Sequence, residues 1–282
     1  MQVFKFKKDL NGFLQSKTYK QKTIGFVPTM GALHEGHIAL VKRAYEENDL
    51  VVVSIFVNPT QFDSKDDLDK YPITLEKDLQ LLKKVSDKII VFTPTKENIY
   101  DNQIKSNSYN FNGLEKVMEG TFREGHFDGV GTIVELLLKA VNPSKAYFGE
   151  KDFQQLQIIK KLVTLKAISC QIIGCPIERE PNGLARSSRN ERLSKSTRKK
   201  ASFIYKTLNT AKNKFGTESA TRIKDWVNNE FSKNSLFKLE YFEITDIDTL
   251  TPILKKQKNR KYRAFIAAYT EEVRLIDNIA LN

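Results

Sequence analysis

Cysteine and histidine are scarce in this sequence, with two and three of them among 282 residues. In a strand, Cys170 and Cys175 would be separated by roughly 16 Å because they are five positions apart, which is too far for a disulfide. A disulfide-stapled scaffold is therefore excluded, and we expect two buried thiols. So few cysteines suit a reducing compartment, so the predicted location is cytoplasmic.

Long apolar runs are also missing. The longest, such as residues 51–57, fall far short of the roughly 20 residues that a bilayer-spanning helix needs. Residues 1–14 mix lysines with apolar side chains and lack the uninterrupted apolar stretch of a signal peptide. With 40% hydrophobic and 28% charged residues, the composition is that of a globular protein. The length suggests about two domains, and no membrane partner is expected.

The formal net charge is +12, and seven basic residues against Glu191 give residues 186–200 a charge of +6. Charge alone does not distinguish a nucleic-acid partner from a nucleotide triphosphate or from simple solubility. For the later part of this segment, a solvated basic helix start is as consistent with the sequence as an anion site.

Short apolar, β-branched runs alternate with helical patterns in the first part of the chain. Strands are predicted at 24–27, 51–57, 88–92, 145–148 and 171–173. Apolar residues at helical spacing lie between them, as in Ile38, Val41 and Tyr45. This alternation predicts an α/β fold with a doubly wound, Rossmann-like parallel sheet that is covered by helices on both faces.

The pattern changes after Pro176. Two helical stretches are followed by predicted strands at 239–244, 262–269 and 273–276, which indicates a smaller α+β unit. We place the boundary near residues 175–177, so the predicted domains are 1–176 and 177–282.

The strongest local signal is PTMGALHEGH at residues 28–37, directly after the first predicted strand. In doubly wound sheets, ligands bind beyond the carboxyl ends of the strands. Gly31 and Gly36 allow close backbone approach, and the helix start offers N–H groups and a positive dipole end. The segment therefore predicts a phosphate site.

Three other interpretations of glycine and histidine motifs fit less well. Gly31 and Gly36 have Walker A spacing, but His37 stands where that loop needs lysine. His34 and His37 are three residues apart, whereas a zinc helix of the H-E-x-x-H type needs four, which leaves zinc a weak alternative. Gly129 and Gly131 resemble the start of a dinucleotide fingerprint, but no strand directly precedes them and the third glycine is missing. What remains resembles the His-x-Gly-His signature of nucleotidyltransferases.

Further segments carry a closer resemblance, which runs essentially end to end. The matching blocks are residues 28–37, 57–62 (VNPTQF), 71–72 (YP), 119–130 (EGTFREGHFDGV), 148–156 (FGEKDFQQL), 183–190 (GLARSSRN) and 274–278 (RLIDN). On these blocks the chain resembles the pantothenate synthetases, ligases that join pantoate to β-alanine.

The resemblance implies a two-step reaction. The carboxylate of pantoate attacks the α-phosphate of Mg²⁺-bound ATP, which gives pantoyl adenylate and pyrophosphate; β-alanine then attacks the acyl carbon and AMP leaves. It also implies a homodimer, an ATP- and pantoate-binding domain at 1–176 and a lid at 177–282. Such chemistry requires positioning and charge stabilisation more than covalent help from the protein.

Residue roles follow from the same resemblance. Catalytic roles fall to His34, His37, Lys151, Ser187, Ser188 and Arg189. ATP binding falls to Met30, His37, Gly149, Lys151, Asp152, Ser187, Ser188 and Arg189. Pantoate binding falls to Gln61, Gln155, Asn58, Glu119 and Arg123. Uncharged glutamine amides suit pantoate because they bind hydroxyls and a carboxylate without neutralising the nucleophile.

Some residues keep two interpretations. His126 is as consistent with a hydrogen-bonded structural histidine as with a site role. Asp78 is a candidate to hold Mg²⁺ through water, although a single exposed helical acid is usually only solvated. Ser194 lies in a segment that resembles a synthetase phosphate loop, but we predict that it caps the next helix. Asn182 and Arg186 depart from the family pattern, where aspartate and an apolar residue are expected.

Two rival functions stay open. One is another adenylyl-transferring enzyme with the same histidine signature that acts on a different acid, against which Gln61 and Gln155 weigh. The other is a basic nucleic-acid-binding protein that uses residues 186–200, and it predicts binding that weakens steeply with salt. The sequence shows no aromatic-rich basic platform beside that segment, so no nucleic-acid partner is expected.

Overall fold

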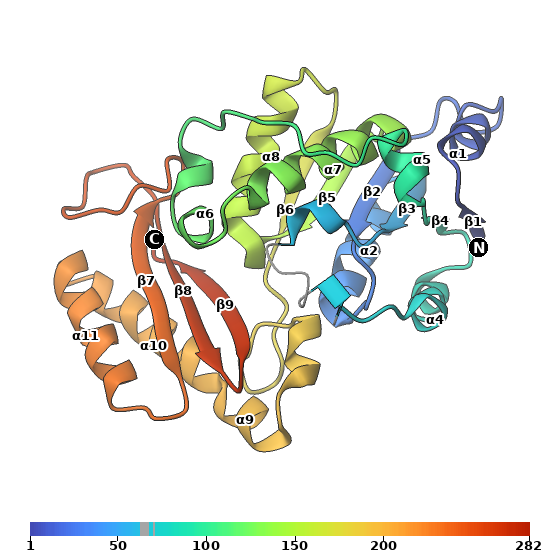
Figure 1. Cartoon of the computed structure of the whole chain (residues 1–282). Helices are drawn as coiled ribbons and strands as arrows, with labels where there is room; N and C mark the ends of the chain where they lie inside the picture. The colour runs from blue at the N-terminus through green and yellow to red at the C-terminus, as the bar shows by residue number, and fades with distance from the viewer. Residues whose placement is uncertain (63–67, 70) are drawn as a thin grey trace. The chain divides into compact units, whose positions relative to one another are not determined.

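The computed structural model describes residues 1–62, 68–69 and 71–282 (Figure 1). The chain forms two compact units. The first unit comprises Met1–Glu115, Glu119–Glu150 and Gln155–Pro176. The second comprises Lys116–Met118, Lys151–Gln154 and Ile177–Asn282. Two short segments that precede residue 177, Lys116–Met118 and Lys151–Gln154, therefore belong to the second unit.

The first unit is built on a six-stranded parallel sheet in the order β1-β4-β3-β2-β5-β6. The strands are β1 (Gln2–Phe4), β2 (Ile24–Thr29), β3 (Leu50–Ile55), β4 (Ile90–Phe92), β5 (Lys145–Gly149) and β6 (Gln171–Cys175). The five strands predicted in this part of the sequence are confirmed. The sequence did not indicate β1, which is only three residues long.

Helices follow the strands. They are α1 (Lys7–Leu14), α2 (Glu35–Glu47), α4 (Leu75–Val85), α5 (Lys96–Tyr100), α6 (Glu119–Phe122), α7 (His126–Val141) and α8 (Phe153–Leu165). Phe26 and Val27 are both fully buried on β2, and alternate strand residues point to opposite faces, so both faces of the sheet are covered. Tyr45 was predicted on the buried face of α2 but is 40% exposed, and Ala44 is buried instead.

The second unit is the predicted α+β unit. It contains α9 (Lys195–Lys200), α10 (Ser202–Phe215), α11 (Ala220–Ser232), β7 (Lys238–Asp246), β8 (Tyr262–Thr270) and β9 (Val273–Ala280). The three strands form an antiparallel sheet in the order β7-β8-β9. Leu208 of α10 and Val227 of α11 pack with Phe242 and Ile266 of the sheet in one hydrophobic core.

Both cysteines carry thiols without a disulfide. Cys175 is buried, as predicted, at the end of β6. The predicted burial of Cys170 is wrong, because this residue precedes the strand and is only half-buried. Within the described residues, no helix combines the length and apolar character needed to cross a bilayer.

Candidate active site

The phosphate loop predicted from the sequence leaves the sheet where the strand order reverses. From β2 the chain proceeds to β3 and β4 on one side, and it later returns to place β5 on the other side of β2. Residues that follow the carboxyl end of β2 therefore lie at the switch point of the sheet, where α/β proteins bind ligands. Met30 is the first of these residues, and α2 begins at Glu35.

The two histidines of this loop are held by the start of α2. His34 is the N-cap residue, and its Nδ1 accepts the N–H of Gly36 at 3.1 Å. The Nδ1 of His37 accepts the N–H of His34 at 3.3 Å, and the two ring centroids are 4.1 Å apart. A neutral imidazole whose Nδ1 accepts a hydrogen bond carries its proton on Nε2. Each ring is thus oriented as an Nε2–H donor beside the positive end of a helix dipole.

Asp78 of α4 holds the loop that leads to these histidines. Its Oδ2 accepts the N–H of Ala32 at 3.0 Å, and its Oδ1 accepts the N–H of Leu33 at 2.8 Å and the hydroxyl of Thr74 at 3.2 Å. Gly31 and Ala32 have φ values of 82° and 50°, a left-handed conformation that is unfavourable for alanine. The carboxylate therefore stabilises a strained turn directly before His34.

The predicted exposure of Asp78 is wrong, because its side chain is buried at 1% exposure. Burial raises the pKa of its carboxyl, although hydrogen bonds from the Leu33 N–H, Thr74 and the Ala32 N–H act in the opposite direction. Both carboxylate oxygens already accept backbone N–H groups, so the residue is poorly suited to be a direct metal ligand. The predicted contact with Mg²⁺ stays a prediction.

We expect Asp78→Asn to destabilise the protein by about 2 kcal/mol, since a carboxamide cannot accept both buried N–H groups. Activity should fall because the turn before His34 loosens, while the Mg²⁺ concentration for half-maximal activity should not change. Urea unfolding and a Mg²⁺ titration measure the two effects. Glu76→Gln, at an exposed position in the first turn of the same helix, is the matched control. An increased Mg²⁺ requirement in Asp78→Asn would instead support the metal interpretation.

A buried hydrogen-bond network orients the side chain of Gln61. Asn58, which is 1% exposed, donates through Nδ2 to Oε1 of Gln61 at 3.1 Å and to the carbonyl of Gly129 at 3.3 Å. The hydroxyl of Tyr100 donates to Oδ1 of Asn58 at 2.5 Å. Nε2 of Gln61 lies 3.0 Å from the sulfur of Met30, so two of the predicted site segments meet here. Tyr100 was not predicted as a site residue, because no motif surrounds it in the sequence.

His126 and Arg123 hold the backbone of the same glutamine. Nη1 of Arg123 donates to Nε2 of His126 at 3.1 Å, so Nδ1 carries the ring proton of a neutral His126 and donates to the Gln61 carbonyl at 2.8 Å. Nη2 of Arg123 donates to the same carbonyl at 3.2 Å, and Nη1 lies 4.0 Å from the Glu119 carboxylate. His126 is 7% exposed. The hydrogen-bonded structural interpretation of this histidine is therefore supported, at a position that supports Gln61.

Gly129 is explained by packing. A Cβ atom at this position would lie 2.3 Å from the carbonyl oxygen of Thr60, a distance that real contacts do not reach. The glycine lets α7 approach the short 3-10 turn Pro59–Gln61, which carries Gln61. Glycine is thus needed at position 129 for steric reasons. This agrees with the sequence-based interpretation that these glycines are not a dinucleotide-binding fingerprint.

Two other predicted residues of the first unit lie beside the sheet's carboxyl edge. Gly149 ends β5 and pairs with Cys175 of β6. Gln155 lies in the first turn of α8 and is half-buried.

In the second unit, Lys151 and Asp152 belong to the 3-10 turn Glu150–Asp152. Nζ of Lys151 lies 3.6 Å from Oδ1 of Asp152, and the lysine side chain is 20% exposed against 49% for the aspartate. A loosely paired, partly exposed ammonium group is available to interact with a phosphate.

Ser187, Ser188 and Arg189 form the start of a second 3-10 turn, Ser188–Arg192. Oγ of Ser187 accepts the N–H of Arg189 at 3.3 Å, so it caps this turn. Asn190 is 1% exposed, and its Nδ2 donates to Oε1 of Glu180 at 2.9 Å and to the Ala185 carbonyl at 3.0 Å. These hydrogen bonds hold the turn in place. No role was predicted for Asn190 from the sequence, although it ends the matching block at 183–190.

The basic run that follows is partly neutralised. Arg198 donates three hydrogen bonds to Glu180 at 2.9 to 3.1 Å and one to Glu191 at 2.9 Å. Burial raises the pKa of Glu180, but hydrogen bonds from Arg198 and Asn190 outweigh it and hold that pKa below its usual value. Nδ2 of Asn182 donates to the Arg198 carbonyl at 2.9 Å, a bond that the aspartate expected from the family could not donate.

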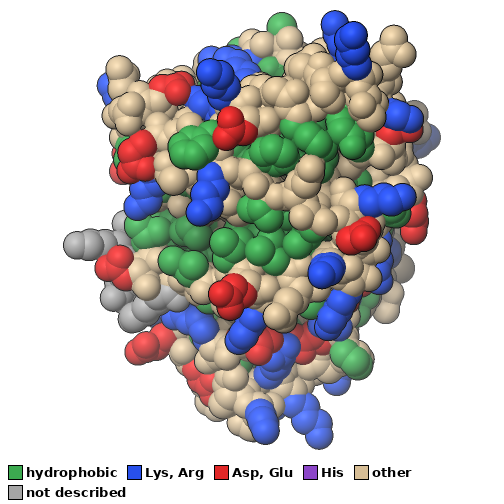
Figure 2. All heavy atoms as spheres, turned by 90° about the vertical axis from the view of Figure 1, so that its right-hand side faces the viewer, with side chains coloured by type: hydrophobic (Ala, Val, Ile, Leu, Met, Phe, Trp, Pro, Cys, Tyr) green, Lys and Arg blue, Asp and Glu red, His purple; other side chains and the backbone are tan. Residues whose placement is uncertain are grey.

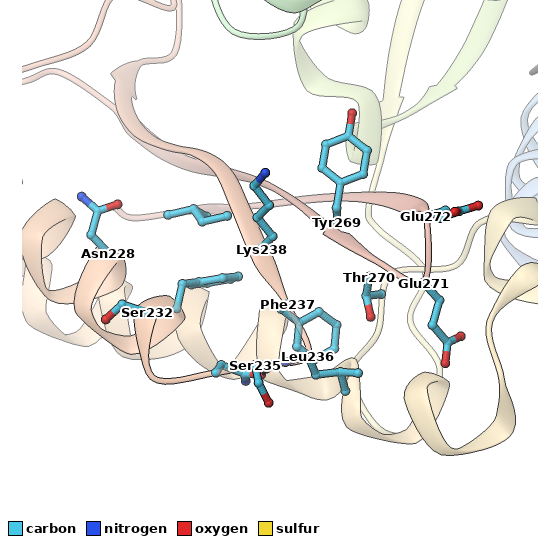
Figure 3. Close-up of a pocket in the computed structure, with 13 residues that line it drawn as sticks. Asn228, Ser232, Ser235, Leu236, Phe237, Lys238, Tyr269, Thr270, Glu271 and Glu272 are labelled. Atoms are coloured by element: carbon cyan, nitrogen blue, oxygen red, sulfur yellow. Dashed lines mark hydrogen bonds between the residues drawn. The ribbon is translucent and has the colours of Figure 1, made fainter.

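Ser194 caps α9, as predicted: its Oγ accepts the N–H of Thr197 at 3.2 Å. Glu271 accepts the N–H and hydroxyl of Ser194 at 2.9 and 2.8 Å and the hydroxyl of Thr197 at 2.5 Å. A surface pocket of about 600 Å³ lies between α11, β7 and the β8–β9 turn, and Glu271 is among the residues that line it (Figure 3). Tyr269, Lys238 and the other residues that line this pocket include none of the predicted site residues.

No group of three or more His, Cys, Asp and Glu side chains that could hold a metal occurs in the described part of the chain. This does not conflict with a requirement for Mg²⁺, since that ion usually keeps several waters and arrives on substrate phosphates with few protein ligands.

Comparison with known proteins gives one consistent result. A family model described as pantoate-beta-alanine ligase matches residues 2–280. The pantothenate synthetase of Christiangramia forsetii is 57% identical over 282 residues and covers 100% of both chains. That of Flavobacterium psychrophilum is 54% identical over 281 residues, again covering 100% of both.

Solved structures agree. Pantothenate synthetase from Thermus thermophilus matches with a TM-score of 0.90 at 37% identity and covers 100% of this chain and 99% of that one. Pantoate-beta-alanine ligase from Francisella tularensis, solved in complex with beta-gamma ATP and beta-alanine, matches with a TM-score of 0.81 at 38% identity, covering 100% and 98%.

Proposed function

Because the chain belongs to the pantoate–β-alanine ligase family and condenses pantoate with β-alanine in an ATP-dependent reaction, we propose that it does so through a pantoyl adenylate at His34 and His37. The observation that carries this proposal is the fixed orientation of both imidazoles. Their Nδ1 atoms accept backbone N–H groups at the topological switch point, so both rings offer Nε2–H donors.

In the first step, a carboxylate oxygen of pantoate forms a bond to the α-phosphorus of ATP. The bond from that phosphorus to the bridging oxygen breaks, and pyrophosphate leaves with the electron pair. Negative charge grows on the phosphate oxygens during this exchange. Nε2–H donors that are oriented beforehand stabilise that charge without reorganisation, which makes electrostatic help effective.

In the second step, the amine of β-alanine attacks the acyl carbon. The attacking amine transfers a proton to water as the amide forms, and AMP leaves with the electrons of the acyl–oxygen bond. Accumulated charge on AMP again faces the histidine donors. We assign no residue to β-alanine.

Pantoate is proposed to bind Gln61 and Gln155. The support is that the Gln61 amide is oriented by Asn58 and its carbonyl by Arg123 and His126, so little side-chain entropy remains to be lost on binding. Asn58, Glu119 and Arg123 then act mainly by holding Gln61.

ATP is proposed to bind the loop at Met30 and His37, Gly149, and a set of residues of the second unit. In that set Lys151 and Arg189 supply positive charge, Ser187 and Ser188 supply hydroxyl donors, and Asp152 lies on the ribose side. Mg²⁺ would enter bound to ATP and reduce the charge of its phosphates. In terms of the predicted domains, residues 1–176 supply the histidines, Lys151 and the pantoate ligands, and residues 177–282 supply Ser187, Ser188 and Arg189.

Isotope exchange between pyrophosphate and ATP tests the intermediate. If a pantoyl adenylate forms, purified protein with Mg²⁺ and pantoate should catalyse this exchange without β-alanine, because the first step is reversible alone. AMP should accumulate catalytically only when β-alanine is added. Exchange that depends on β-alanine would overturn the two-step proposal while leaving the ligase activity intact.

A homodimer is proposed from one surface of the first unit. Apolar side chains gather on the face shown in Figure 2. Val3 of the edge strand β1 is 43% exposed, and Phe6, which precedes α1, is 52% exposed. Apolar patches of this kind on a single chain mark association surfaces. Sedimentation equilibrium should give twice the chain mass of 32.4 kDa, and a mass equal to one chain would overturn this. A cytoplasmic location is also proposed. It is supported by the two thiols, Cys170 and Cys175, which form no disulfide.

A further inference from the structure

Asn278 of β9 contacts the backbone of Lys151. Its Nδ2 donates to the Lys151 carbonyl at 2.8 Å, although the two residues are 127 positions apart in sequence. Its Oδ1 accepts a hydrogen bond from Arg263 of β8. The side chain is 1% exposed. Both ends of the amide are therefore used, and their partners leave the side chain a single orientation.

A buried ion pair supports Asn278 from the neighbouring position. Asp277 is 4% exposed and receives both arms of Arg179 at 2.6 and 2.9 Å, and its Oδ1 also accepts the N–H of Asn278 at 2.7 Å. The guanidinium group of Arg179 stacks on Tyr205 at 3.7 Å and donates to the Gly183 carbonyl at 3.0 Å. A bidentate pair of this kind is geometrically specific.

The segment Lys151–Gln154 joins a 3-10 turn to the first residues of α8. Lys151 lies in a three-residue 3-10 turn, whose hydrogen bonds have poorer geometry than those of an α-helix. Its contacts in the second unit come from elsewhere in the chain: Arg263 lies 4.0 Å from the ring of Phe153, and Phe265 is 5.9 Å from the same ring. Asn278 adds a side-chain hydrogen bond to the carbonyl of Lys151 itself.

We infer that Asn278 is a positioning residue for Lys151: it anchors the lysine carbonyl and thereby sets where the ammonium group meets the phosphates. This inference rests on the phosphate-binding role proposed for Lys151. Displacement of a charged group by about 1 Å can reduce a rate by 10²-fold, so a backbone anchor on the residue that carries the ammonium group has a large effect on catalysis.

A double-mutant cycle tests the inference. Asn278→Asp keeps the shape of the side chain and an oxygen for Arg263, but replaces the donor to Lys151 with an acceptor. We expect kcat to fall about 10-fold to 100-fold. In a Lys151→Met background the same change should alter kcat less than about twofold, because no ammonium group remains to be displaced.

Asn282→Asp is the matched control. Like Asn278, Asn282 donates through Nδ2 to a backbone carbonyl, that of Arg260, but its Oδ1 accepts the N–H of Tyr262 and the residue is exposed. It should leave kcat unchanged. Thermal unfolding is measured for every variant, and Asn278→Ser, which adds no charge, replaces Asn278→Asp if the latter does not fold.

The outcomes are separable. If Asn278→Asp lowers kcat equally in the wild-type and Lys151→Met backgrounds, or in neither, the positioning role of Asn278 is overturned. The proposed role of Lys151 is then unaffected. Full activity of Lys151→Met alone overturns the proposed role of Lys151, and with it this inference. A fall in kcat that occurs only where Lys151 is retained supports both the positioning role of Asn278 and the phosphate-binding role of Lys151.

Discussion

Replacement of His34 by asparagine should lower kcat by about 10² to 10³, which is the usual effect of removing one preorganised donor to a transition-state oxyanion. Asparagine is chosen because it is a good N-cap residue, and its Oδ1 can accept the Gly36 N–H that Nδ1 accepts in the wild type. The substitution thus removes the Nε2–H donor while retaining the helix cap. Rapid-quench measurement of pyrophosphate release records the catalytic rate, and thermal unfolding records the stability of the variant separately.

His34→Ala provides the comparison. It should show the same loss of kcat and an additional loss of stability of about 1 kcal/mol from the missing cap. Glu46→Gln, at an exposed position near the other end of α2, should change neither kcat nor stability. A folded His34→Asn or His34→Ala variant with full activity would refute the proposed role of the imidazole.

Lys151→Met should reduce kcat by two to three orders of magnitude as well, since methionine keeps most of the apolar stem and removes only the charge. An ammonium group that contacts the phosphates as charge develops contributes to the transition state more than to ground-state binding. The affinity for ATP, measured by calorimetry, should therefore fall much less than kcat.

The matched control for this change is Lys160→Met, which makes the same substitution at an exposed position of α8. Its kcat should equal that of the wild type. Lys151→Arg should recover part of the activity, because the charge returns with different geometry. A loss of ATP affinity as large as the loss of kcat would show that Lys151 contributes uniform binding and no specific stabilisation of the transition state.

The histidine pair could be found in the sequence because its geometry is local. His34 and His37 are three residues apart at a helix start, and the hydrogen bonds that orient them run within residues 34–37. The alternation of strands and helices likewise gave the parallel sheet and the position of this loop at its carboxyl edge. These features follow from chain periodicity and from the handedness of β-α-β crossovers.

The supporting residues could not be found in that way. Asp78 binds a turn 46 positions away, Tyr100 binds Asn58 across 42 positions, and Asn278 binds Lys151 across 127. Asp78 looked like an exposed acid because its neighbours in α4, Glu76 and Lys77, are polar and exposed. Only the packing of α4 against the loop shows that its carboxylate is buried.

The amino-acid order was therefore sufficient for the fold class, the phosphate loop and the chemistry of the groups that face the substrates. Which side chains hold those groups in place depended on the folded chain, because one hydrogen bond between distant residues leaves no periodicity or spacing in the sequence. Buried donors and acceptors must be paired wherever the fold brings them together. That requirement selects partners in space, and it gives Asp78, Tyr100 and Asn278 their roles.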